Sequence, residues 1–159
     1  MLETIRQYAS DKLRESREAE IIRRRHVDYF LALAEQAEPG IRGAQQGVWL
    51  NRLELEHDNL RAALRATETS KEVEVGLKLA ATLWRFWSVR GHWREGFGWL
   101  VQALEMSKGI STSIRAKALH GASAFAQRLG KYDRAQEYAE EKLVLSRSVG
   151  DKPSIAGAL

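Results

Sequence analysis

A chain of 159 residues, 44% of them hydrophobic, is long enough for one ordinary domain or a short run of repeated units. It contains no cysteine, which excludes disulfide scaffolds, zinc–thiolate sites, iron–sulfur clusters and cysteine nucleophiles. The formal net charge of +4 permits a nucleic-acid or acidic partner without requiring one.

The composition predicts an all-α chain, because it has only 2 prolines and is rich in alanine, leucine, glutamate and arginine. Apolar side chains at helical spacing predict one helix over residues 2–16 and a second over 18–37. Pro39-Gly40 is expected to end the second helix, since proline disfavours a helical residue before it and glycine accepts a reversed backbone. The glycines of residues 40–47 predict a loop.

Five further helices are predicted by hydrophobic spacing, each followed by a glycine or a polar break. An eighth helix is expected to begin near Pro153, because proline is favourable in a first helical turn. The five helices cover residues 49–66, 73–89, 93–106, 113–129 and 132–148.

No apolar stretch approaches the roughly 18 residues that are needed to span a membrane. The first six residues, Met-Leu-Glu-Thr-Ile-Arg, lack the basic start and apolar middle of a secretory signal. We therefore expect a cytoplasmic protein with no membrane partner.

The second half of the chain repeats itself. Gly91-His92-Trp93-Arg94-Glu95-Gly96 aligns with Gly130-Lys131-Tyr132-Asp133-Arg134-Ala135 at an offset of 39 residues, and residues 116–119 recur at 156–159. In each corner a glycine allows the chain to reverse, an aromatic side chain fills the space between two helices, and a small residue permits close packing. Repeated helical hairpins of this length predict a helical solenoid.

These corners resemble the Gly-x-Tyr-x-x-Ala corner of the tetratricopeptide repeat. The resemblance implies stacked antiparallel helix pairs that bind partners on their concave side. The chain departs from that family in its longer spacing, in the missing proline at the helix end, and in Lys142, which stands where the preceding repeat has the small Ala103.

Residues 1–9, 24–26, 49–64 and 83–87 resemble the region behind the nucleotide-binding domain of bacterial STAND-type signal-transduction ATPases. Many of those proteins are transcription regulators with LuxR-type or related DNA-binding domains. The resemblance implies that residues 1–66 form a helical lead-in that caps the array, with a start similar to the end of a winged-helix linker. Residues 71–159 would be repeats, the last one truncated, and the chain would be a segment of a larger regulator.

No catalytic chemistry or cofactor is expected in this chain. It has no Gly-x-x-x-x-Gly-Lys-Ser/Thr phosphate loop, and the glycines of residues 40–47 lack the following lysine. His57 and Asp58 are adjacent on a helix, so their side chains point in different directions. The spacing predicts no metal site among His26, His57, His92 and His120.

Two further patterns are interpreted as structural. The five tryptophans, Trp49, Trp84, Trp87, Trp93 and Trp99, are expected to pack in the core rather than to form a ligand cage. Arginines 23–25 follow Glu18 and Glu20, which favours a mixed-charge solvated face over a nucleic-acid patch.

Family analogy places the binding groove on the first helix of each hairpin. Its candidate residues include four cations and no acid, so we expect it to prefer an acidic protein or peptide, or a small anionic signal molecule. The alternative is that these side chains are ordinary solvated positions. The candidate groove residues are Lys78, Arg85, Ser88, Lys117, His120, Gln127 and Arg128.

The sequence therefore predicts a non-enzymatic interaction or sensing module, whose other partners are the ATPase and DNA-binding domains of a larger chain. Two alternatives stay open. One is direct binding of nucleic acid through the basic surface, and the other is a structural adaptor for oligomerisation.

Overall fold

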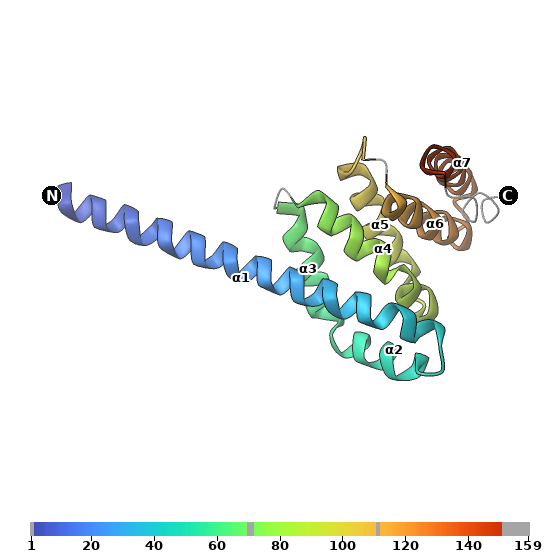
Figure 1. Ribbon diagram of the computed structural model, residues 1–159, viewed down its shortest axis with the longest axis horizontal. Helices are drawn as coiled ribbons and strands as arrows, with labels where there is room; N and C mark the ends of the chain where they lie inside the picture. Colours follow the sequence, from blue (N-terminus) through green and yellow to red (C-terminus); the bar gives the residue numbers. More distant parts are fainter. Residues whose placement is uncertain (1, 70–71, 111, 151–159) are drawn as a thin grey trace.

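The computed structural model describes residues 2–69, 72–110 and 112–150 (Figure 1), and every regular element within those ranges is an α-helix. The expected all-α class is therefore confirmed. None of these helices is both long enough and apolar enough to span a membrane. The elements are α1 (Leu2–Arg42), α2 (Gln46–Leu55), α3 (His57–Thr69), α4 (Val73–Arg90), α5 (Trp93–Met106), α6 (Ser113–Arg128) and α7 (Tyr132–Val149).

Helix α1 is a single element of 41 residues, so the prediction of two helices over 2–16 and 18–37 was wrong. Side-chain ion pairs at i, i+3 continue along its surface, as between Lys12 and Glu15 at 3.2 Å. Pro39 does not end the helix either. A proline removes one backbone hydrogen bond, and burial of Ile41 at 2% exposure stabilises the turn that follows.

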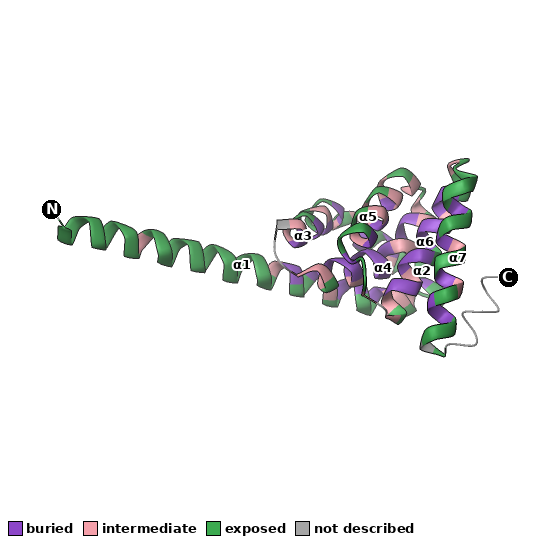
Figure 2. Ribbon diagram, turned by 90° about the horizontal axis from the view of Figure 1, so that it is seen from above, coloured by how far each residue is buried: buried purple, intermediate pink, exposed green. Residues whose placement is uncertain are grey.

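The two halves of α1 have different surroundings. Residues 2–25 are exposed apart from the partly buried Asp11, and this half projects from the body as a rod (Figures 1 and 2). From Val27 onward, an apolar stripe with helical spacing packs against α2, α3 and α4. The buried residues of the stripe are Val27, Phe30, Leu33, Ala34, Ala37 and Ile41.

The helix predicted over residues 49–66 is two helices, α2 and α3, separated by a turn at Glu56. The Glu56 backbone has φ −95° and ψ 8°, and its N–H donates to the Arg52 carbonyl at 3.2 Å. The turn lets Leu53 before it and Leu60 after it both reach the core, where each is 1% exposed. Helix α2 also begins at Gln46, inside the predicted loop.

The four hairpin helices agree with their predicted positions to within one or two residues. Helix α4 packs against α5, and α6 packs against α7, with α4 and α6 side by side. Gly91 and Gly130 have φ values of 80° and 72°, which confirms the predicted reversal at both corners. The eighth helix predicted near Pro153 lies outside the described residues.

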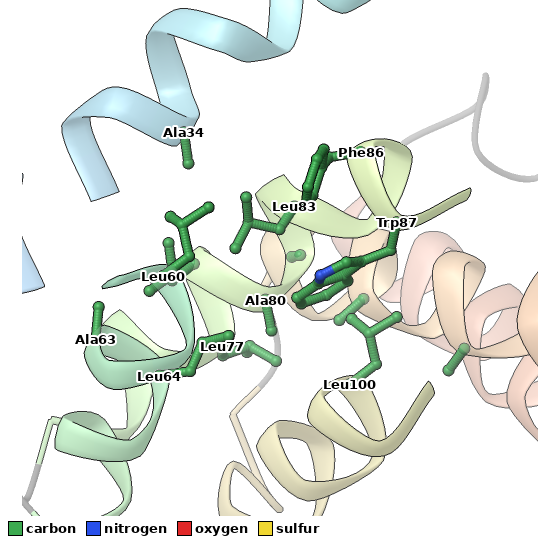
Figure 3. Packing of buried hydrophobic residues seen from close by; sticks show 14 of the residues in the cluster. Ala34, Leu60, Ala63, Leu64, Leu77, Ala80, Leu83, Phe86, Trp87 and Leu100 are labelled. Carbon is green, nitrogen blue, oxygen red and sulfur yellow. The ribbon is translucent and has the colours of Figure 1, made fainter. Parts of the chain in front are cut away.

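Helix α4 is the centre of the core, because α1, α3, α5 and α6 all pack on it. Figure 3 shows Leu77 and Leu83 of α4 on the side of Leu60 and its neighbours on α3, while Trp87 lies towards Leu100 of α5. Trp87 is 1% exposed, and the other four tryptophans are partly buried against this cluster, which confirms their expected packing role.

The corner aromatics differ between the two hairpins. Trp93 is partly buried, and its indole Nε1 donates to the Ser88 carbonyl at 3.0 Å, as expected of a residue that fills the corner. Tyr132, its counterpart, is 71% exposed, so the same expectation was wrong there. The guanidinium of Arg128, from the next hairpin, lies over Trp93, whereas no helix of the described ranges follows to cover Tyr132.

Candidate functional site

The predicted groove residues lie on α4 and α6, the adjacent first helices of the two hairpins. The packed half of α1 lies beside α4 and brings acidic side chains to the same surface. Glu35 forms an ion pair with Lys78, and Glu38 forms one with Lys117. The candidate groove residues themselves include no acid, but α1 supplies carboxylates to this surface that the repeat positions do not reveal.

Positive charge gathers around Trp84 instead. The Arg85 guanidinium lies 5.0 Å from the Trp84 ring centre, and the His120 ring meets the same indole edge-on at 5.1 Å. Lys142 of α7 places its Nζ 3.5 Å from His120 Nδ1. Within the described part of the chain, the buried Nε of Arg85 has no hydrogen-bond partner.

The shift in the pKa of His120 is consistent with a positively charged surface. Desolvation of the ring lowers the pKa, and the positive charges of Lys142 and Arg85 lower it further. Cations from two helices, α4 and α7, therefore act on one imidazole of α6. We call Trp84, Arg85, His120 and Lys142 the basic cluster. Lys142 was noted in the sequence only as a departure from a small-residue position, and its charge was not assigned to the groove.

The other three predicted groove residues lie near the hairpin corner. The Ser88 carbonyl accepts the Trp93 indole N–H, and the Arg128 guanidinium lies 4.8 Å from the Trp93 ring centre. Gln127 is exposed. Arg128 thus contributes to packing of the corner, and the seven predicted residues do not form one uniform surface.

The mixed-charge interpretation of residues 23–25 agrees with the ion pairs found there. Arg23 pairs with Glu20 at 2.9 Å, and Arg24 pairs with Glu72 at 3.2 Å. This pairing reduces the positive charge available to a phosphate backbone at that part of α1.

A second polar cluster lies where the α2–α3 turn meets the α4–α5 corner, and sequence reasoning missed it. Glu54 Oε1 is 3.0 Å from His92 Nε2, and His57 Nε2 is 3.0 Å from Glu95 Oε1. Both contacts join residues 38 positions apart, so the two segments run alongside each other. A constant offset between polar residues of the lead-in and of the first corner is the only sequence signal that could have indicated this.

Arg61 completes this second cluster and fixes its charge. Its Nε and Nη2 donate to the two carboxylate oxygens of Glu95 at 2.9 and 2.7 Å. Burial alone would raise the pKa of Glu95. The Arg61 hydrogen bonds and the charges of His57 and Arg61 outweigh it and lower the pKa from 4.5 to about 2. Glu95 is therefore ionised at neutral pH.

Taken together, the geometry of the described residues defines an all-helical array of hairpins that carries the basic cluster and the second polar cluster. No family model matches the chain, and no solved structure matches it. Three curated relatives do, one from Mycobacterium bovis and two from strains of Mycobacterium tuberculosis, all provisionally named as HTH-type transcriptional regulators. Each is 34% identical over 168 aligned positions, which include the whole of this chain but only 19% of the relative.

The chain thus spans about a fifth of the length of the regulators that it matches. The similarity extends across the lead-in and both hairpins, since it includes the whole chain. The relatives' names concern transcription regulation, and they assign no role to this segment.

Proposed function

We propose that this chain is a non-catalytic, tetratricopeptide-like sensing module of a bacterial transcriptional regulator. One observation carries the proposal. The whole chain is 34% identical to a segment that makes up about a fifth of the length of proteins named as HTH-type regulators. The stacked hairpins support it, because repeat arrays offer extended binding surfaces whose packing responds to a ligand. Under the STAND-type resemblance, the ATPase and DNA-binding domains lie elsewhere in the same protein.

The basic cluster is the part of the predicted groove that best fits an anionic ligand. Lys78 and Lys117 form ion pairs with α1, and Arg85 and His120 both contact the Trp84 ring, with Lys142 Nζ 3.5 Å from His120 Nδ1. The Arg85 guanidinium, whose buried Nε has no hydrogen-bond partner among the described residues, supplies donors, and the Trp84 face supplies apolar contact. A carboxylate, from an acidic peptide or from a small signal molecule, matches both features.

The mechanism follows from the position of the cluster between α4, α6 and α7. A ligand bound there contacts both hairpins and favours the packing in which they present the cluster together. It shifts the equilibrium only by its difference in affinity for the two packings, and the attached domains respond to that shift. The module itself performs no chemistry.

The test is genetic. In the source organism, Arg85→Glu is introduced into the chromosomal gene and compared with an in-frame deletion of residues 73–149. We expect both changes to alter transcript levels of the same limited set of genes. Arg94→Glu is the matched control, because it reverses a charge on the exposed side of α5, away from the basic cluster. A deletion that changes no transcript while the gene is expressed contradicts the proposal.

The nucleic-acid alternative is separated by binding to a short DNA duplex, followed by fluorescence anisotropy. Weak binding that falls steeply between about 50 and 200 mM salt without sequence preference indicates only generic electrostatics. Salt-resistant, sequence-selective binding by this chain alone contradicts a purely sensing role.

A further inference from the structure

The contact between the α2–α3 turn and the α4–α5 corner brings together three side chains of a kind that bind metal ions. One ligand atom from each of Glu54, His57 and His92 lies within 4.8 Å of the other two. The individual contacts are 3.0 Å from Glu54 Oε1 to His92 Nε2 and 3.7 Å from Glu54 Oε1 to His57 Nδ1. Three elements supply the three residues.

These separations suit a tetrahedral ion. Zinc bonds to histidine nitrogen and carboxylate oxygen at about 2.0–2.2 Å, so neighbouring ligand atoms lie roughly 3.3–3.5 Å apart in a tetrahedron. The two distances from Glu54 Oε1 fall on either side of that value. The two histidine nitrogens lie within 4.8 Å of each other, so binding of one ion by all three atoms would draw the two imidazoles closer together.

The hydrogen bonds behind the cluster also fit a metal site. His57 Nε2 faces Glu95 Oε1 at 3.0 Å, and Arg61 donates two hydrogen bonds to the Glu95 carboxylate. A carboxylate in that place favours the proton on Nε2, which leaves the Nδ1 lone pair facing Glu54. Metal-ligating histidines almost always donate their second ring N–H to such an acceptor.

The three side chains differ in solvent exposure. An open coordination position requires that solvent reach one side of the cluster, and the exposures fit this. The His57 side chain is 9% exposed, whereas those of His92 and Glu54 are 28% and 39% exposed. Arg90 also lies beside Glu54, and its Nε is 3.7 Å from Oε2, whereas Oε1 is the atom that faces both histidines. Water can reach the outer side.

We propose that Glu54, His57 and His92 bind a divalent transition-metal ion of the zinc class, with water as the fourth ligand. Two imidazoles and one carboxylate form a donor set that suits zinc. The bound ion connects the lead-in to the first hairpin, and it stabilises that contact. The proposal is independent of the sensing role, and it departs from the expectation of no metal site, which rested on spacing along the sequence.

The test is a titration of the purified, chelator-treated chain with zinc chloride by calorimetry, and with cobalt(II) by visible absorption. We expect one ion per chain, a tetrahedral cobalt spectrum, and a higher Tm with zinc. His92→Gln and Glu54→Gln are the variants of choice, because both side chains are partly exposed and tolerate replacement better than His57. Each should weaken zinc binding by at least tenfold.

His120→Gln is the matched control, since it removes a histidine from α6, outside the cluster, and should leave zinc binding unchanged. Glu95→Gln keeps the three ligands but removes the acceptor behind His57, and it should weaken binding by about 10- to 100-fold. The proposal is overturned if the wild-type chain takes up no ion, or if its binding is unaffected by both His92→Gln and Glu54→Gln. Equal loss in His120→Gln would likewise assign the ion to another place.

Discussion

Arg61 on α3 donates two parallel hydrogen bonds to Glu95 on α5, of 2.9 Å from Nε to Oε1 and 2.7 Å from Nη2 to Oε2. The pair joins residues 34 positions apart and connects the lead-in to the first hairpin. Paired N–H donors of this kind are stronger than single neutral hydrogen bonds. Because the folded protein holds the Glu95 pKa at about 2, this contact makes stability depend on pH.

The first prediction concerns that pH dependence. A carboxyl group whose pKa is lower in the folded state stabilises the fold above its unfolded pKa, and the stabilisation disappears as pH falls through the folded pKa. The Glu95 contribution is therefore present at pH 7 and lost between about pH 5 and 2. Since the carboxylate is partly solvated, we expect about 2 kcal/mol rather than the full shift. Urea unfolding followed by circular dichroism at several pH values measures it.

The variants are Glu95→Gln and, as the matched control, Glu140→Gln. Glu140 is exposed on α7, and its carboxylate accepts a hydrogen bond from the nearby Gln136 at 2.8 Å. Glu95→Gln should destabilise the chain at pH 7 and flatten the dependence on pH, whereas Glu140→Gln should do neither. Parallel pH curves for Glu95→Gln and the wild type would show that the pair contributes nothing.

The second prediction compares two glycines two positions apart on α5. A Cβ at Gly96 would lie 2.8 Å from Phe125 Cε2 and 2.9 Å from Trp87 Cε3, inside the packed core. A Cβ at Gly98 would meet no atom within 4 Å. Gly96→Ala should therefore lower the free energy of unfolding by about 1–3 kcal/mol, because the added methyl group overpacks the core. Gly98→Ala should raise the free energy of unfolding by about 0.5–1 kcal/mol, because alanine is the better helix former.

Thermal and urea unfolding of both variants measures these changes. A stabilised Gly96→Ala variant would mean that the α4–α5 and α5–α6 contacts are looser than described. The comparison also tests the sequence interpretation, which assigned the close approach to the small residue at this corner.

The hairpins were predictable from the sequence because their signals are local. The positive φ of Gly91 and Gly130 and the buried small residues Gly96 and Ala135 all belong to one six-residue pattern. A pattern of this length specifies where a helix ends, and two copies of it specify the stacking. The first helix was harder, since its polar middle carries neither a strong break nor a clear stripe.

The second polar cluster and the acidic side chains beside the groove were not predictable, because they depend on which elements become neighbours. Glu35 and Glu38 lie on α1, and nothing in the repeat pattern indicates that α1 packs beside α4. His57 and His92 are 35 positions apart, and the pairing of their segments follows from the turn at Glu56. A prediction of surface charge that considers only the residues of the repeats therefore omits charged side chains from other segments.

The third prediction concerns Arg115, which is 8% exposed and joins three helices. Its Nη1 donates to the Leu104 and Ser107 carbonyls at 2.9 and 3.0 Å, at the end of α5, and its Nη2 donates to Glu141 of α7 at 2.6 Å. Arg115→Ala leaves two buried carbonyls without this donor, so we expect a loss of about 2–4 kcal/mol.

Urea unfolding measures the loss, with Arg94→Ala on the exposed side of α5 as the control. The loss of stability for Arg115→Lys should lie between those for Arg94→Ala and Arg115→Ala. An ammonium group replaces some of the hydrogen-bond donors but not the planar guanidinium. A cost for Arg115→Ala no larger than that for Arg94→Ala would mean that water replaces the guanidinium at little expense.

The last prediction concerns the projecting half of α1. Residues 2–25 have almost no buried surface, and an isolated helix gains little stability from its own backbone hydrogen bonds. Deletion of residues 2–18 should therefore reduce the helical circular dichroism signal while leaving the Tm of the body within about 2 °C. Phe30→Ala, in the packed half and 6% exposed in the wild type, should instead cost about 3 kcal/mol. If the deletion lowers the Tm as much as Phe30→Ala does, the exposed stripe that includes Ile5 and Tyr8 is covered in solution, and sedimentation of the intact chain would then show a second copy.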